Sequence, residues 1–122
     1  MDRELEKMFQ EMTRRLLQAT RDRKAHWRET AESNTFRVAF GGGIVEVQGL
    51  SGPVVRVTLM NRSGEIIEEA DATKHSHPDM RSVFGELFAW ARRSAMGTEG
   101  LLSKMLDALR QDDFEDLPEP EE

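Results

Sequence analysis

The spacing of apolar residues changes twice along this chain, and these changes constrain the fold more than any other feature. Near the N-terminus apolar residues recur every three or four positions, which predicts an amphipathic helix extending to about Thr30. From Thr35 they alternate with polar residues, as in half-buried strands. Between Met80 and Leu109 the helical spacing returns, with a break at Gly97. Helices are therefore expected on both sides of a β region.

Three turn signals divide the central region into four strands. They are Gly41–Gly43, Ser51–Pro53 and Asn61–Gly64. Consecutive strands joined by such short turns are antiparallel neighbours. We therefore expect an α+β fold with a long N-terminal helix, a four-stranded antiparallel β-meander with one solvated face, and two C-terminal helices.

Length and composition limit this fold to one domain. At 122 residues the chain is long enough for a single core, and 38% hydrophobic residues suffice to build it. The net charge of −6 comes largely from residues 111–122, which carry seven carboxylates, no basic residue and two prolines. We expect residues 1–110 to form a single α+β domain and residues 111–122 to be a disordered acidic tail.

The sequence also bears on where such a protein resides. No apolar run approaches the roughly 20 residues that cross a bilayer, and the N-terminus lacks the profile of a signal peptide. With no cysteine, the chain has no disulfide framework, thiol nucleophile or thiolate metal site. We expect a cytoplasmic protein of bacterial type that makes no contact with a membrane.

No pattern in the sequence predicts catalysis. One cluster has the character of a metal site: Asp71, His75, His77 and Asp79. A solvent-exposed, helix-capping loop explains the same residues, and we favour it. Gly41–Gly43 joins two strands rather than opening a helix, so it is not a phosphate-binding loop. We expect no enzyme activity, cofactor or metal; a metal-binding alternative would use His75 and His77.

Basic residues spaced by seven lie on the polar side of the predicted N-terminal helix: Arg14, Arg21 and Arg28. Such a stripe could track phosphates, so the alternative function is a nucleic-acid-binding protein of the nucleoid-associated kind. Nearby carboxylates partly neutralise the stripe, for example Glu11 beside Arg15. A solvated helix face explains the same pattern, and we favour it.

The three predicted helices carry more apolar surface than one face of a small sheet can cover. We therefore expect a non-enzymatic interaction or adaptor module that forms a homodimer through its N-terminal helix, with the sheet or the Arg92 side meeting a protein partner. Trp27 and Trp90 lie at the edges of apolar stripes, where an indole suits a core edge or an interface hot spot. The predicted interface residues are Met8, Phe9, Met12, Leu16, Trp27 and Trp90.

Residues along most of the chain resemble a group of small bacterial proteins of unknown function. They are Leu16-Leu17-Gln18-Ala19-Thr20, Trp27, Thr30, the hairpin from Phe36, the turn Asn61–Gly64, and Ala91-Arg92-Arg93-Ser94-Ala95 ahead of Leu101 and Leu102. The resemblance implies that Trp27 and residues 91–95 matter to the fold or to a shared partner, and it implies no activity. The order of elements is similar to that of the nucleoid-associated YbaB/EbfC family, whose members are dimers that bind DNA. An extra strand and the acidic tail depart from that family, and no binding residue is carried over.

Overall fold

The computed structural model describes residues 2–71 and 78–118. These residues form three helices and one five-stranded antiparallel sheet, which confirms the α+β class. The helices are α1 (Arg3–Arg21), α2 (Pro78–Met96) and α3 (Thr98–Arg110). The strands are β1 (Arg28–Glu29), β2 (Thr35–Phe40), β3 (Gly43–Gly49), β4 (Val55–Asn61) and β5 (Ile66–Asp71).

The strands pair in chain order, from β1 to β5, as an antiparallel meander. Gly41 and Gly42 connect β2 to β3 and both have a positive φ, which glycine adopts without steric cost. Between β4 and β5, the side chain of Asn61 accepts hydrogen bonds from the backbone N–H groups of Ser63 and Glu65, each at 3.0 Å. Both of these predicted hairpins are confirmed.

The end of α1 differs from the prediction. The helix stops at Arg21, and Arg23 has a left-handed φ of 62°. The N–H of Lys24 donates to the carbonyl of Ala19 at 2.9 Å, and the N–H of Arg23 donates to Thr20 at 3.1 Å. This is the Schellman pattern that terminates helices, formed here without the glycine that usually marks it.

The shorter helix makes room for an additional strand. β1 pairs with β2, placing Arg28 opposite Arg37 and Glu29 opposite Phe36. The N–H of Thr30 continues the pairing with a 3.2 Å hydrogen bond to the carbonyl of Thr35. The predictions of a helix to Thr30 and of a four-stranded sheet are therefore both wrong, because this segment forms a sheet edge.

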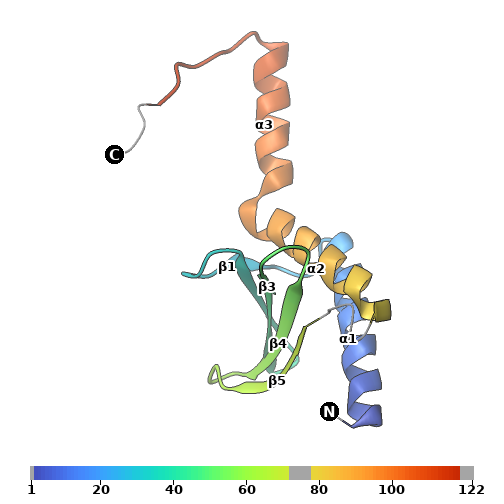
Figure 1. Ribbon diagram of the computed structural model, residues 1–122. Helices are drawn as coiled ribbons and strands as arrows, with labels where there is room; N and C mark the ends of the chain where they lie inside the picture. Colours follow the sequence, from blue (N-terminus) through green and yellow to red (C-terminus); the bar gives the residue numbers. More distant parts are fainter. Residues whose placement is uncertain (1, 72–77, 119–122) are drawn as a thin grey trace.

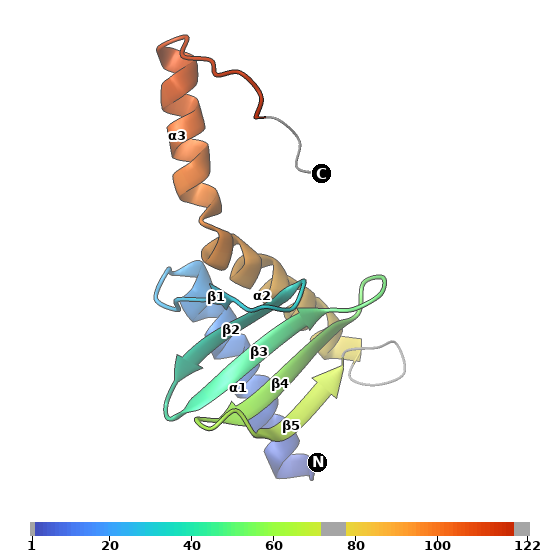
Figure 2. The ribbon, with the colours of Figure 1, turned by 90° about the vertical axis from the view of Figure 1, so that its left-hand side faces the viewer.

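Two of the helices, α1 and α2, lie on one face of the sheet. α2 lies across the inner face, and α1 packs on α2 (Figures 1 and 2). Within the described residues, no Cα atom of α1 comes within 8 Å of a strand Cα atom, so α1 stands off the sheet. The centre of the core comes from α2, whose side chains there are at most 2% exposed: Met80, Phe84, Leu87 and Ala91.

One glycine sets how closely α2 approaches the sheet. The ring of Phe88 lies over Gly49 of β3, and a Cβ atom at position 49 would come within 2.9 Å of it. Phe88 also packs on Phe36 of β2, with ring centroids 5.7 Å apart. A side chain at position 49 would therefore push α2 away from the strands that it covers.

The last helix projects from this body. α3 follows Gly97, whose φ of 64° turns the chain, and it extends away from the sheet (Figures 1 and 2). Gly97 is the N-cap of α3, and no side-chain hydrogen bond caps the helix. No residue of α3 is buried.

Candidate functional site

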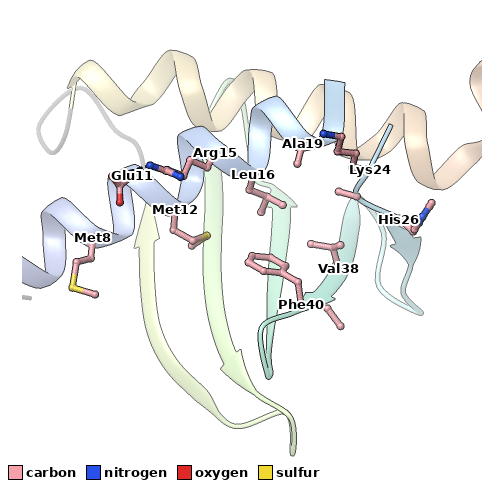
Figure 3. Close-up of a pocket in the computed structure, with 12 residues that line it drawn as sticks. Met8, Glu11, Met12, Arg15, Leu16, Ala19, Lys24, His26, Val38 and Phe40 are labelled. Atoms are coloured by element: carbon pink, nitrogen blue, oxygen red, sulfur yellow. Dashed lines mark ion pairs between the residues drawn. The ribbon is translucent and has the colours of Figure 1, made fainter. Parts of the chain in front are cut away.

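An apolar groove lies where α1 stands off the sheet. It has a volume of about 760 Å³ and opens between α1 and β2. Figure 3 shows Met12 and Leu16 pointing from α1 toward Val38 and Phe40 of β2. Its apolar lining includes Met8, Met12, Leu16, Ala19, Val38 and Phe40. The size is within the range of about 300–1,000 Å³ that is typical of ligand pockets, and the lining suits apolar side chains.

Charged and polar groups border this groove unevenly. Glu11 and Arg15 form an exposed ion pair at 3.6 Å along α1, so their charges largely cancel. Lys24 and His26 line the end where α1 terminates (Figure 3). Among the described residues, Lys24 has no ion-pair partner. This end of the groove therefore attracts negative charge.

A buried hydrogen-bond chain fixes the segment after α1. The Trp27 indole N–H donates to the hydroxyl of Thr20 at 3.0 Å, and that hydroxyl donates to the carbonyl of Leu16 at 2.7 Å. Trp27 and Thr20 are both almost fully buried. The Thr20 hydroxyl satisfies an indole that would otherwise be unpaired, which explains why these residue types stand at this spacing.

The predicted interface residues fall into two groups. Phe9, Leu16 and Trp27 are at most 8% exposed and pack into the core of the single chain. Met8 is 66% exposed, whereas Met12 and Trp90 are partly buried against the core. Most of the apolar face of α1 is thus covered by α2, and its uncovered edge faces the groove.

An uncovered apolar surface lies on α3. Five side chains, each more than half exposed, follow one face of this helix, hereafter the α3 stripe: Leu101, Leu102, Met105, Leu106 and Leu109. An ion pair of 2.8 Å joins Glu99 in the first turn to Arg23 after α1. The stripe itself has no covering layer among the described residues. It has the composition of an interface and is exposed to water.

An acidic segment follows the α3 stripe directly. Residues 111–118 carry four carboxylates and no basic side chain. Phe114 lies between these carboxylates and Leu117 follows the last of them; the two side chains are 76% and 93% exposed. The end of α3 therefore combines an apolar surface with a strong negative charge.

The three arginines predicted to bind nucleic acid do not form one stripe. Arg14 and Arg21 lie on α1, but Arg28 belongs to β1 because the helix ends before it. The guanidinium of Arg21 donates to a carboxylate oxygen of Glu86 at 2.7 Å, which ties α1 to α2. The prediction that the three arginines form one stripe on a single helix is therefore wrong. Nucleic-acid binding through these residues stays a prediction.

The outer face of the sheet carries ordered charge pairs. Arg37 donates to Glu46 at 2.8 Å across β2 and β3, and Arg56 of β4 contacts Glu69 and Asp71 of β5 at 3.0 and 2.9 Å. The hydrogen bond to Asp71 raises the pKa of the Arg56 guanidinium above its ordinary value. This face is built for contact with water, as one face of the sheet was expected to be.

The alternative metal site falls mostly outside the described residues. His75 and His77 lie outside the described residues. Within residues 2–71 and 78–118, no three His, Cys, Asp or Glu side chains are placed to hold a metal ion. In the same parts of the chain, no helix is long and apolar enough to cross a bilayer.

Comparison of the chain with protein-family models, with curated proteins and with solved structures gives no match in any of the three. The apolar spacing of α3 is visible in the sequence, but nothing there indicates that this helix is the uncovered one. The groove leaves no sequence signal, because it depends on how far α1 stands from Val38 and Phe40.

Proposed function

We propose that this protein is a non-enzymatic interaction module that associates with a second copy of itself, and that α3 is the element through which it associates. The observation that carries the proposal is the α3 stripe, which no described part of the chain covers. This favours α3 over α1 as the self-association surface, because the apolar face of α1 is largely used within the subunit.

An isolated helix of this kind gains most of its stability from a partner. α3 has 13 residues, and helices shorter than about 12–15 residues are marginal on their own in water. Complete burial of a Leu or Met side chain contributes about 1.5–3 kcal/mol, so burying five half-exposed side chains supplies several kcal/mol. Association would therefore stabilise both the helix and the complex.

A second copy is the favoured partner because the chain itself carries two apolar surfaces. The α3 stripe and the α1–β2 groove are both open, and two identical subunits can cover them without any other protein. Twofold dimers are also by far the commonest oligomers. A further protein partner on the sheet or on the Arg92 side stays a prediction.

Sedimentation velocity of the full chain from low to high micromolar concentration tests the proposal. The wild-type protein should sediment as a dimer at the upper concentrations, and Met105→Glu should shift it to a monomer because a charge then lies in the α3 stripe. Ser103→Glu is the matched control, since it adds the same charge to the other face of the same helix and should leave the dimer intact.

Two results would contradict self-association through α3. A wild-type chain that remains a folded monomer at high micromolar concentration removes the self-association itself. A dimer that Met105→Glu and Ser103→Glu weaken equally removes α3 as its interface. Because Met105 is 54% exposed in the subunit, its replacement should not disturb the core, and circular dichroism can verify this.

A further inference from the structure

We infer that the α1–β2 groove receives α3 of the second copy, so that two subunits exchange their last helices reciprocally. The inference rests on the proposed function and specifies its geometry. In such a dimer each α3 stripe fills the groove of the other subunit. The same contact forms twice around a twofold axis, which closes the assembly at two subunits.

The two surfaces match in length and in chemistry. A 13-residue helix is about 20 Å long, and the part of α1 that lines the groove, from Met8 to Ala19, extends for about 17 Å. The side chains offered by α3 are leucine and methionine, and the groove residues that keep exposed surface include Met8, Met12 and Phe40. The helix would lie along the mouth of the groove and insert its apolar side chains.

The groove is not occupied by the subunit's own α3. Gly97 directs that helix away from the sheet, and the ion pair between Arg23 and Glu99 holds its first turn beside the end of α1 (Figures 1 and 2). A projecting terminal helix joined through one glycine, together with an open groove in the same chain, is the arrangement from which exchange of an element between subunits arises.

Charge determines which way the incoming helix should run. At the Lys24 end of the groove, Arg21 and Arg23 are paired with Glu86 and Glu99, so Lys24 and Arg28 outnumber the one carboxylate of residues 21–28. Residues 2–7 at the opposite end carry two basic side chains and three carboxylates. The four carboxylates of residues 112–116 follow α3 directly. They should lie at the Lys24 end, which places the incoming α3 parallel to α1.

Mixing two single variants tests the exchange. Phe40→Glu damages the groove and leaves α3 intact, and Met105→Glu damages α3 and leaves the groove intact. Each variant alone should be monomeric, because neither of the two equivalent contacts can form. An equimolar mixture should form a heterodimer through the one contact that combines both intact surfaces. Native mass spectrometry separates this heterodimer from either homodimer.

The other outcomes separate the exchange from self-association as such. If Phe40→Glu dimerises like the wild type while Met105→Glu does not, the helices pair with each other, the exchange is overturned and self-association stands. If both folded variants stay monomeric in the mixture, the exchange is likewise overturned. A wild-type monomer, whether its own α3 folds back or a small apolar ligand fills the groove, overturns both proposals.

A second groove variant guards against a folding defect. Phe40 ends β2 and is 45% exposed, so glutamate should be tolerated, but Met8→Glu changes an even more exposed groove residue on a helix. The two variants should behave alike in the mixing experiment. If Phe40→Glu fails to fold, Met8→Glu replaces it, and a dimer of Met8→Glu as tight as the wild type contradicts the exchange.

A matched pair of charge reversals tests the direction in which the incoming α3 runs. Lys24→Glu should weaken the dimer about two- to five-fold at low salt and have almost no effect at high salt. Lys7→Glu, at the opposite end of α1, should change the dissociation constant less. A larger effect of Lys7→Glu would mean that α3 runs in the opposite direction.

Discussion

α2 and α3 are neighbouring amphipathic helices that meet at a single glycine, yet their apolar faces have opposite surroundings. The face of α2 is sealed between α1 and the sheet, and Phe84 and Leu87 are almost inaccessible to solvent. On α3, by contrast, every side chain of the α3 stripe is more than half exposed in the described parts of the chain. An apolar stripe therefore shows that a helix needs a covering surface, but not whether the same subunit provides it.

The largest expected contrast between the two helices is in the free energy of unfolding. Phe84→Ala should lower the stability of the subunit by about 3–5 kcal/mol, because it leaves a cavity under α1. Leu106→Ala, on the exposed face of α3, should change it by less than about 0.5 kcal/mol when measured at concentrations at which the protein is monomeric. Urea denaturation monitored by circular dichroism provides both values. Equal losses would mean that α3 is part of the subunit core.

A smaller effect on stability tests whether the buried hydrogen bond between Trp27 and Thr20 stabilises the end of α1. Thr20→Val retains the shape of the side chain but removes the acceptor of the Trp27 indole N–H, which is then buried without a partner. The expected loss is about 1–3 kcal/mol of stability. The same denaturation experiment measures it, with Thr30→Val as a control because Thr30 lies outside the core. No loss for Thr20→Val would show that this hydrogen bond contributes little.

The smallest expected effects concern the junction and the first turn of α3. Gly97→Ala places a side chain at a φ of 64° and should weaken dimerisation by about 1 kcal/mol, or roughly five-fold. Gly100→Ala adds a methyl group in open space within the helix and should strengthen dimerisation by a similar factor, because alanine favours helix. Sedimentation equilibrium gives both dissociation constants. If neither dissociation constant changes, the helicity of α3 does not contribute to dimerisation.

Sequence patterns predicted the parts of the fold that depend on local periodicity. α2 and α3 appear as expected because Gly97 divides two strong stripes, and the hairpins at residues 41–42 and 61–64 follow from their turn residues. The end of α1 was missed because arginine, not glycine, takes the left-handed position at residue 23. β1 was missed because two residues are too short to show any alternation.

The sequence predicted only one part of the candidate site. A surplus of apolar helix surface was expected from the sequence, but it was assigned to α1, where Phe9 and Leu16 turn out to be covered by the subunit itself. Which helix remains uncovered depends on tertiary packing. α2 packs on the sheet and α1 packs on α2, whereas α3 projects from the subunit with its apolar face exposed. The spacing of residues within one helix contains no information about that competition.

The exposure of α3 also has a consequence for how the protein resists proteolysis. Because no residue of α3 is buried, proteolytic cleavage near Gly97 would remove the helix and the acidic residues after it while every core side chain kept its neighbours. Under the proposed assembly, protection of that peptide bond would follow the abundance of the protein, since mass action sets the paired fraction. A dilute population would lose its terminal segments first and persist as folded remnants unable to pair by exchange.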